Sequence, residues 1–343
     1  MVTAVDSRTR REPAGPLVSL SVKVEADDGG RPAPRGSRWR RGRLLAVCAV
    51  LLAVVIGLHE LVPNRWGNLG SLVATFLPWL GLAVPLLILG AVVRRSAIAA
   101  LLALAPLAAW VGVFGPQLTP VEPRAYDLTV VQHNVADDNH DVERTVEVLL
   151  AADPDIVALE EVTSEHLSQY EAALGQTFEH HATQGTVGLW SRHPIAERTR
   201  VDIRPPGIGA SWDRCLRAVV RTPAGDAAVY VAHLPSVRLG PRGLAASSRN
   251  RSAELLGEEI AADPAPAVLL AGDLNGNLRD RGLAPVTDQV SREEHGFRLT
   301  FPAALPVVQL DHVLARGAEV TELRVLPLSG SDHLPVAARV SLG

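Results

Sequence analysis

The strongest constraint on the fold of this 343-residue chain is an apolar block, Leu44 to Pro116, in which only four residues carry a charge. The sequence after this block has an ordinary globular composition. We therefore expect two unequal parts, an apolar helical region and a globular domain over residues 126–343. Residues 1–42 contain much Pro, Gly and Arg and few large apolar side chains, which predicts a disordered tail.

The apolar block divides into three segments, at about 44–62, 69–93 and 96–115. At 1.5 Å per residue, each is about long enough to cross a hydrocarbon core of about 30 Å. A cleaved signal peptide is the alternative for the first segment, but the long tail before it and the two apolar segments behind it disfavour cleavage. We expect three transmembrane helices, and residues 117–125 as a stiff linker.

Arginines predict the orientation of these helices. Four of them precede the first segment, at Arg38, Arg40, Arg41 and Arg43, and Arg94-Arg95 joins the second segment to the third. Positive residues favour the cytoplasmic side of a membrane. The tail and the Arg94-Arg95 turn are therefore expected in the cytoplasm. The protein would be a multi-pass protein of the cytoplasmic membrane, with its globular domain extracytoplasmic.

The charge of the globular part limits its partners. Residues 126–343 hold 19 Lys+Arg and 30 Asp+Glu, a net charge of −11, whereas residues 1–125 hold 14 and 7. Polynucleotide binding rests on clustered cations that neutralise phosphates, so nucleic acid is not the expected partner. The two cysteines, Cys48 and Cys215, cannot form a disulfide framework. The sequence leaves the oligomeric state open.

Short β-prone runs alternate with helical patterns in the globular part. Helices are expected at 141–152, 164–174 and 249–261, and strands at 127–134, 156–159, 216–221, 227–232, 267–270, 309–314 and 337–340. Hairpins mixed with βα units favour an α/β fold with mixed sheets over a purely parallel sheet.

Several of these strands stop at a residue that can bind a metal or move a proton. Asn134, Glu161, His233 and Asp273 each follow such an apolar run. A single polar ending is unremarkable, but endings that together supply Asn, Glu, His and Asp predict an active site on a strand scaffold.

The carboxylates among these endings have two candidate roles. Glu161 is a candidate ligand for a hard divalent cation such as Mg²⁺, which takes oxygen ligands; a solvated strand end is the alternative. Asp273 and Asn275 are two residues apart and can point the same way. Asp273 could then act on a water while Asn275 donates to a phosphoryl oxygen. An Asx turn is the alternative for this pair.

A histidine near the C-terminus completes the set. His333 follows Asp332, and Asp311 in another predicted strand can orient and polarise its imidazole. An imidazole paired in this way is a good acid or base at neutral pH. His233 is the second candidate histidine, and an exposed acid–histidine pair is the alternative reading of Asp332-His333.

In this order and spacing the motifs resemble the endonuclease/exonuclease/phosphatase superfamily, the DNase I-like proteins. The resemblance runs from about Asp127 to the end, and it departs at Glu160, where the family usually has Gln. It rests on Asn134, Leu159-Glu160-Glu161, Ser191-Arg192-His193-Pro194-Ile195, Ala232-His233, Gly272-Asp273-Leu274-Asn275, Leu310-Asp311-His312 and Ser331-Asp332-His333-Leu334-Pro335. It implies two mixed β-sheets packed face to face and flanked by helices, a four-layer α/β sandwich.

The resemblance also implies a Mg²⁺-dependent phosphoester hydrolase, with Mn²⁺ as a substitute metal. Its metal ligand would be Glu161, with Asn134 and Asp332 on the metal side. The catalytic residues would be His233, Asp273, Asn275, Asp311 and His333. Further phosphate contacts could come from Arg217, Arg249 or Arg251, for which a solvated surface position is the alternative.

The combination of apolar spans with this domain resembles actinobacterial teicoplanin-resistance membrane proteins. That resemblance implies a link with antibiotic resistance and a lipid-linked or small phosphate ester or pyrophosphate as substrate, such as undecaprenyl pyrophosphate or a related cell-wall lipid carrier. A short linker would hold the site near the lipid bilayer and raise the effective substrate concentration. An extracytoplasmic nuclease and a non-catalytic module that binds a phosphate ligand stay open as alternatives.

Overall fold

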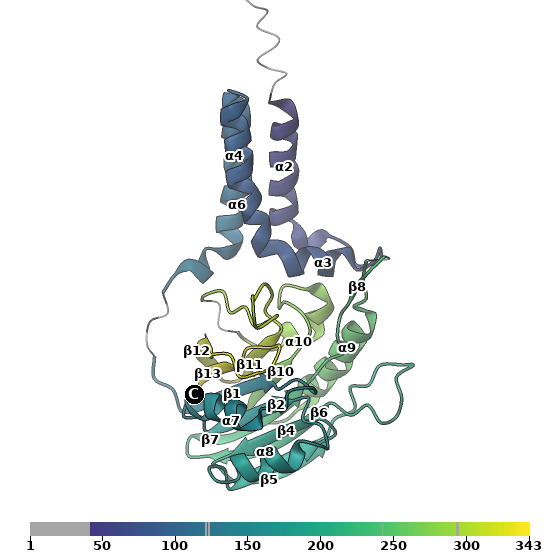
Figure 1. The fold of residues 1–343 in the computed structure, drawn as a ribbon, viewed down its shortest axis with the longest axis vertical. Coiled ribbons are helices and arrows are strands. Elements are labelled where there is room, and N and C mark those ends of the chain that lie inside the picture. The colour runs from purple at the N-terminus through teal and green to yellow at the C-terminus, as the bar shows by residue number, and fades with distance from the viewer. Residues whose placement is uncertain (1–41, 121, 123, 242, 293–294) are drawn as a thin grey trace, which may run out of the picture.

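The computed structural model describes residues 42–120, 122, 124–241, 243–292 and 295–343. A bundle of helices stands on one end of a layered α/β domain (Figure 1). The expected disordered tail lies outside the described residues, apart from Gly42.

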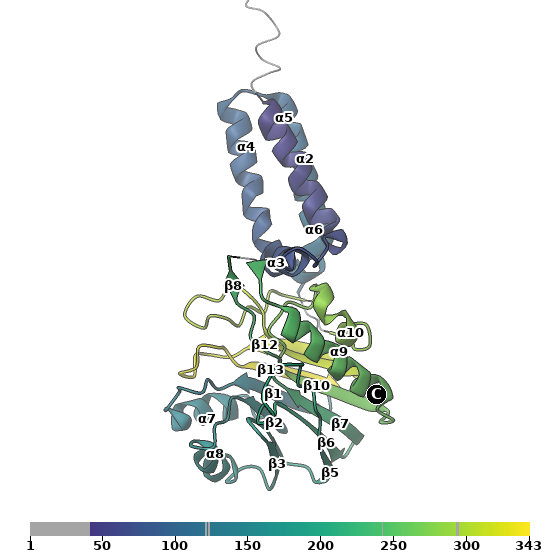
Figure 2. The same ribbon diagram turned by 90° about the vertical axis from the view of Figure 1, so that its right-hand side faces the viewer.

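The bundle consists of helices that stand side by side, with one helix across their base (Figures 1 and 2). The upright helices are α2 (Arg43–Gly57), α4 (Ala83–Val93), α5 (Ala97–Leu102) and α6 (Leu104–Phe114). The transverse helix is α3 (Leu69–Phe76). The 3-10 turn η1 (His59–Leu61) connects α2 to α3, η2 (Leu77–Leu82) connects α3 to α4, and η3 (Pro116–Leu118) follows α6.

The expectation of three membrane spans is met only in part. Among the described residues two helical stretches, Leu69–Val93 and Ala97–Phe114, are long and apolar enough to cross a membrane, whereas Arg43–Gly57 has 15 residues. The stretch Leu69–Val93 is also not straight, because η2 separates α3 from α4. Pro78 lies in the first turn of η2, and proline cannot donate the backbone hydrogen bond that would continue a helix.

The globular domain contains two mixed sheets. The six-stranded sheet has the order β12 (Glu319–Val325), β13 (Val336–Ser341), β1 (Leu128–Asn134), β2 (Ile156–Glu160), β4 (Val187–Ser191) and β3 (His180–Gln184). The five-stranded sheet has the order β11 (Asp311–Arg316), β10 (Ala267–Asp273), β7 (Gly225–Ala232), β6 (Cys215–Thr222) and β5 (Ile195–Arg200). The pairs β1–β2 and β7–β10 are parallel and the others antiparallel.

Helices cover the outer face of each sheet. The six-stranded sheet packs against α7 (Val142–Leu150) and α8 (Leu167–Leu174). The five-stranded sheet packs against α9 (Ser247–Ala262), η4 (Arg281–Leu283) and α10 (Ala284–Thr287). A small hairpin, β8 (Leu239–Gly240) and β9 (Gly243–Leu244), reaches toward α3. The four-layer sandwich implied by the family resemblance is therefore confirmed.

Alternation along the strands explains this layering. In β2, Ile156 and Ala158 join the core between the sheets, whereas Val157 and Leu159 join the core under α7 and α8. Successive side chains of a strand point to opposite faces, so strands buried on both faces read as continuous apolar runs. Each fully buried Val, Leu or Ile contributes about 1.5–3 kcal/mol, which makes the two sheets a rigid frame for residues at their ends.

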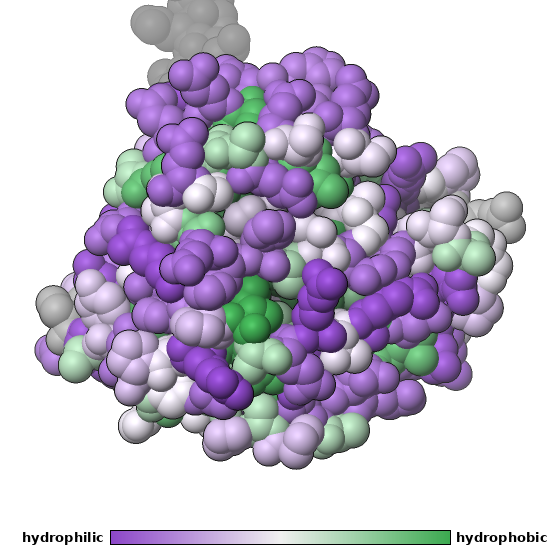
Figure 3. Space-filling model, turned by 90° about the horizontal axis from the view of Figure 1, so that it is seen from below, coloured by the Kyte–Doolittle hydropathy of each residue, from purple (hydrophilic) through white to green (hydrophobic). Residues whose placement is uncertain are grey.

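The bundle contacts the domain through loops of the five-stranded sheet. Trp79 Nε1 donates to the carbonyl of Val307 (2.7 Å), and Arg279 donates to the carbonyl of Val113 (3.0 Å). In addition, Ser71 of α3 donates to the buried Asp280 (2.7 Å), which also pairs with Arg249 of α9. The domain face turned away from the bundle is mainly hydrophilic (Figure 3).

Candidate active site

The inner faces of the strands end in polar side chains. In β1 the alternation that buries Val130 continues to Gln132 and Asn134, and the inner face of β10 ends at Asp273. In β7 the inner-facing residues are Val229 and Val231, and the same alternation places His233, just after the strand, on the inner face. Because β10 and β11 pair in register at Asp273 and Asp311, these carboxyl groups lie at the same end of the inter-sheet layer. The fold thus brings together residues that are up to two hundred positions apart.

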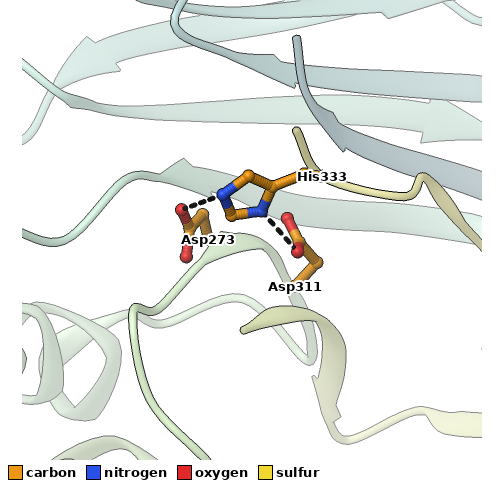
Figure 4. Close-up of side chains that lie close together, drawn as sticks. All are labelled: Asp273, Asp311 and His333. Atoms are coloured by element: carbon orange, nitrogen blue, oxygen red, sulfur yellow. Dashed lines mark hydrogen bonds and ion pairs between the residues drawn. The ribbon is translucent and has the colours of Figure 1, made fainter. Parts of the chain in front are cut away.

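His333 lies between the two aspartates (Figure 4). Its Nδ1 donates to Asp311 Oδ2 at 2.8 Å, and its Nε2 is 3.8 Å from Asp273 Oδ2. The backbone N–H of His333 donates to Ser331 Oγ (3.0 Å), and Ser331 donates to the carbonyl of Asn134 (2.7 Å). The loop before β13 is therefore tied to the end of β1, which fixes the imidazole in place.

Amide donors hold Asp273. Its Oδ2 accepts from Asn134 Nδ2 (3.1 Å) and Asn275 Nδ2 (3.3 Å), and its Oδ1 accepts from the backbone N–H of Asn275 (2.8 Å). The last bond is the Asx turn expected as an alternative for this pair, so one arrangement serves both the turn and the site. Gly272 is needed here, because a Cβ would lie 2.0 Å from the carbonyl oxygen of Ala232.

Burial and neighbouring charges set the protonation states of His333, Asp273 and Asp311. Burial alone would lower the pKa of His333, but the negative charges of Asp311 and Asp273 raise it to about 10. Burial raises the pKa of Asp273 to about 7, although the charge of His333 acts against this rise. The charge of His333 and its hydrogen bond hold the pKa of Asp311 below its usual range, against the effect of burial. At neutral pH the site therefore contains an imidazolium, an ionised Asp311 and a carboxyl group, Asp273, that can exchange protons.

Glu160 is linked to Asp311 through the side chain of Gln132. It is fully buried, and its Oε2 accepts from Gln132 Nε2 (2.7 Å), which also donates to Asp311 Oδ1 (3.0 Å). Burial, together with the charge of Asp311, raises the pKa of Glu160 well above its usual value. Burial therefore favours the neutral carboxylic acid form of Glu160 in the folded protein.

Glu161 lies at the open side of the site. Its backbone has a φ of 61°, which turns the chain out of β2, and its side chain is 22% exposed. The backbone N–H of Asp137 donates to Glu161 Oε2 (3.1 Å), and Glu161 Oε1 is 3.7 Å from His233 Nε2. His233 Nε2 is also 3.7 Å from Asp273 Oδ2, so His233 connects the two carboxyl groups.

Arg214 keeps His233 neutral. Its Nη1 lies 3.0 Å from His233 Nδ1. Burial and the charge of Arg214 hold the pKa of His233 well below its usual value. Because Arg214 can only donate, Nδ1 is the acceptor of the neutral ring and Nε2 carries its proton, whereas the His333 imidazolium is protonated on both nitrogens.

Two sets of residues could hold a metal ion. Ligand atoms of Asp273, Asp311 and His333 lie within 4.8 Å of one another. However, a histidine ligand must be neutral, and His333 is held protonated by its carboxylate partners. Glu161 fits a hard cation better, because it offers a partly exposed carboxylate oxygen and leaves room for water ligands. Asn134, whose Oδ1 accepts from Ala136 N (3.0 Å), borders this place.

The structure does not bring every predicted residue to the site. Arg217 forms a bidentate pair with Asp263 (2.5 and 3.0 Å) on the outer face of the five-stranded sheet, and Arg251 pairs with Glu254 on the surface of α9. Alternation accounts for Arg217, because the inner residues of β6 are its even-numbered neighbours Leu216 and Ala218. The side chain of Asp332 is exposed, outside the His333 cluster.

Sequence reasoning missed residues that the structure places at the site. Arg214 was not proposed, although it continues the even-numbered inner face of β6. Gln132 was missed as well, although it lies on the inner face of β1, two residues before Asn134. Thr300, whose Oγ1 accepts from the backbone N–H groups of Leu310 (3.1 Å) and Asp311 (3.4 Å), carries no comparable signal in its surroundings.

Several solved structures have a fold similar to that of the globular domain. A conserved protein of unknown function from Enterococcus faecalis has a TM-score of 0.52 and 17% identity, over 62% of this chain and 99% of its own. TDP2 of D. rerio, solved with a single-strand DNA product, has a TM-score of 0.51 and 18% identity, over 62% and 98%. Beta toxin of Staphylococcus aureus has a TM-score of 0.50 and 15% identity, over 62% and 99%. At these identities the likeness concerns the fold.

A comparison with functionally curated proteins finds no match. A family model, by contrast, covers most of the globular domain. It describes the endonuclease/exonuclease/phosphatase family and matches residues 130–333, from β1 to the histidine between the two aspartates. Because this match extends over more than half of the chain and includes the site residues, the chain belongs to the endonuclease/exonuclease/phosphatase family.

Proposed function

We propose that the protein is a membrane-anchored, divalent-metal-dependent phosphoester hydrolase that acts outside the cytoplasm on a lipid-linked phosphate ester or pyrophosphate. The observation that carries this proposal is the position of the bundle. The loops that follow β7 and β10, and the segment before β11, carry or adjoin the site residues. The same three segments contact the bundle, at Leu244, Asp280 and Val307. A substrate anchored beside the bundle would therefore present its phosphate near these loops.

The surface of the bundle supports membrane insertion. Leu86, Val93 and Leu101 are 68%, 72% and 67% exposed, and only 22% of each candidate span is buried. A core helix of a water-soluble protein would bury most of its apolar side chains. Exposed apolar surface on this scale is unfavourable in water but is satisfied in lipid. We propose that α2, α4 and the α5–α6 pair cross the membrane together.

The proposed orientation places the site outside the cytoplasm. The start of α2 and the turn between α4 and α5 lie at the end of the bundle remote from the domain (Figures 1 and 2). Arg43 and the pair Arg94-Arg95 therefore share one end, as the positive-inside rule requires. Trp66 and Trp79 lie toward the other end, where tryptophan is enriched at membrane interfaces.

Mg²⁺ is the proposed metal. Glu161 would hold it, with Asn134 nearby, and the bound cation would polarise a phosphoryl oxygen and neutralise developing charge. Mn²⁺ would be an acceptable substitute, because it also favours oxygen ligands. The donor set of one open carboxylate suits a cation that retains water and completes its coordination with substrate phosphate.

The protein side chains supply proton transfer and orientation. Asp273, held by Asn134 and Asn275, accepts a proton from the attacking water, for which its raised pKa suits it. The His333 imidazolium donates a hydrogen bond to the phosphoryl group and protonates the leaving oxygen. Asp311 keeps that ring charged and oriented. His233 is neutral, and its Nε2–H faces Glu161 and Asp273, so it can donate a hydrogen bond on the metal side.

A nuclease is the alternative that the same fold allows. The net charge of −11 over residues 126–343 disfavours a polyanion as substrate. The deciding experiment is a panel assay of the purified full-length protein with Mg²⁺ on lipid pyrophosphates, phospholipids, nucleotides and DNA. Faster cleavage of DNA than of every lipid would replace the proposal by a nuclease. If no ester in the panel is hydrolysed, the proposal would be replaced by a non-catalytic module that binds a phosphate ligand.

The topology has its own test. A reporter that is active only outside the cytoplasm should be active when fused after Gly343. Activity of a cytoplasmic reporter at that position would overturn the orientation.

A further inference from the structure

An apolar pocket of about 450 Å³ lies where the bundle meets the domain. From the bundle it is lined by Trp79 and Leu82 of η2 and by Leu107 and Trp110 of α6, and from the domain by Phe297 and Leu299. Among the described residues, none that lines the pocket carries a charge. The volume falls in the range of small-molecule sites, roughly 300–1,000 Å³.

The polar atoms of the two tryptophans are already used. Trp110 Nε1 donates to the carbonyl of Pro78 (2.8 Å) and Trp79 Nε1 to the carbonyl of Val307 (2.7 Å). Both indoles therefore present apolar ring surface to the pocket. Gly81 makes this arrangement possible, since a Cβ there would lie 2.5 Å from Trp110 Nε1. The pocket suits a hydrocarbon rather than a polar headgroup.

Aromatic packing holds the domain side of the pocket against the bundle. The ring of Phe297 stacks on Trp110 with centroids 6.1 Å apart and lies 5.7 Å from the ring of Phe114. The loop that carries Phe297 is thereby fixed beside the pocket, so the pocket is a feature of the joined bundle and domain.

The same loop leads directly to the catalytic group. Two residues after Leu299 comes Phe301, whose ring centroid lies 4.9 Å from that of His333. The Cα atoms of two residues that are two positions apart are separated by at most about 7 Å. Thr300, between them, accepts hydrogen bonds at the start of β11 and supports Asp311. The pocket and the His333 site therefore adjoin through a segment of three residues.

The other end of the pocket reaches the outer surface of the bundle. Leu82 is 61% exposed and Leu107 39% exposed, and both continue the exposed apolar surface of the upright helices. A hydrocarbon chain in a surrounding bilayer could therefore reach the pocket past Leu82 and Leu107. This continuity favours a lipid chain over a peptide or a second copy as occupant.

Resting on the function proposed above, we infer that this pocket binds the phosphate-proximal part of the hydrocarbon chain of the substrate. The chain lies against Trp79, Trp110 and Leu107, and Phe297 and Leu299 guide its phosphate end to His333. The substrate class is thus a single-chain lipid phosphate or pyrophosphate, selected by its chain as well as by its headgroup.

The test compares alkyl diphosphates that share a headgroup and differ in chain length, from about 4 to about 16 carbons, with full-length protein in nanodiscs. Leu107→Trp fills the pocket from the bundle side. Overpacking a filled site costs about five- to 150-fold, so kcat/KM for the longest chain should fall by at least about fivefold. The short-chain substrate should lose less than twofold. Comparing variant with wild type for each substrate cancels its partition into the membrane.

Leu86→Trp is the matched control, because Leu86 lies on the same bundle but outside the pocket and is 68% exposed. It should leave both substrates unaffected. Equal losses for short and long chains with Leu107→Trp, or equal effects of the two variants, would refute the pocket while the hydrolase function stands. Failure of the wild-type protein to hydrolyse any member of the series would instead refute the proposed function.

A second readout does not depend on turnover or on a substituted protein. An alkyl diphosphonate with a photoreactive diazirine near its phosphonate end should label residues 78–85, 107–110 or 297–299, as mapped by mass spectrometry. Labelling confined to the outer face of α4, around Leu86 and Leu89, would contradict the inference.

Discussion

Replacing Asp311 by Asn removes one charge from the centre of the site and changes little else in shape. Asp311 is fully buried, its Oδ2 accepts from His333 Nδ1 at 2.8 Å, and its Oδ1 accepts from Gln132. The amide oxygen of Asn can still accept from Nδ1. It cannot stabilise the positive charge of the imidazolium, and the NH₂ group that replaces Oδ1 cannot accept from Gln132, so the substitution mainly removes the electrostatic part of the pairing.

The expected size follows from the geometry. A buried hydrogen bond to a charged group contributes about 1.5–3 kcal/mol, and a change of one in pKa corresponds to about 1.36 kcal/mol. Because the carboxylate favours the charged ring, its loss should lower the pKa of His333 from about 10 by about 1 to 2. His333 would remain mostly protonated at pH 7. Asp311→Asn should therefore reduce neutral-pH activity much less than His333→Ala, which removes a proton donor contributing about 10²–10⁴-fold.

The assay is the pH dependence of kcat/KM for phosphate release by the full-length protein with saturating metal. The decline at high pH, where His333 loses its proton, should begin about 1 to 2 pH units lower in Asp311→Asn. Glu322→Gln is the control, because this substitution removes the same charge from the domain. Glu322 pairs with Arg339 at the edge of the six-stranded sheet, away from the site. An unmoved alkaline decline in Asp311→Asn, or an equal displacement in the control, would refute the assigned pairing.

Three further substitutions test separate parts of the account. Glu161→Gln should raise the Mg²⁺ concentration needed for half-maximal activity at least tenfold, and weaken Mn²⁺ binding measured by electron paramagnetic resonance; unchanged binding would remove Glu161 from the metal site. Glu160→Gln should retain activity. Because the raised pKa of Glu160 means that its folding contribution is present below pH 4.5 and is lost as pH rises, this variant should melt above wild type at pH 7–8, with the difference vanishing near pH 4. A lower melting temperature at pH 8 would contradict its neutral state. Asp280→Asn leaves the buried Arg249 without a carboxylate and should destabilise the protein by about 3–5 kcal/mol, seen as a lower calorimetric melting temperature; a change below about 1 kcal/mol would show that the pair is dispensable.

Local patterns were sufficient to predict an α/β fold with mixed sheets, and the family resemblance added the packing of two sheets into a sandwich. Strand runs and their polar endings are properties of neighbouring residues, so Asn134, Asp273 and His233 could be found without a structure. Alternation alone separates Arg214, on the inner face, from Arg217, which faces outward to Asp263. The predicted phosphate contact at Arg217 is wrong because Leu216 and Ala218 occupy the inner face of β6, and Arg217 lies on the opposite face.

Contacts between distant segments were beyond the sequence. Hydropathy predicted apolar spans, but the transverse position of α3 depends on η2 and on the hydrogen bond from Ser71 to Asp280. Likewise the raised pKa of Glu160 depends on its burial and on the charge of Asp311, which lies in the opposite sheet. The contact between Phe301 and His333 depends on a loop without regular structure. None of these pairings leaves a periodic signal along the chain.

The central claim is that the His333 site faces the membrane and hydrolyses lipid-linked phosphate there. The most direct measurement is phosphate release in the presence of Mg²⁺ from a lipid pyrophosphate placed either in the same vesicles as the full-length protein or in separate vesicles. We predict rapid release only when enzyme and lipid share a membrane, and release about 10²–10⁴-fold slower from the His333→Ala variant. Equal release from separate vesicles, or an active His333→Ala variant, would contradict the account.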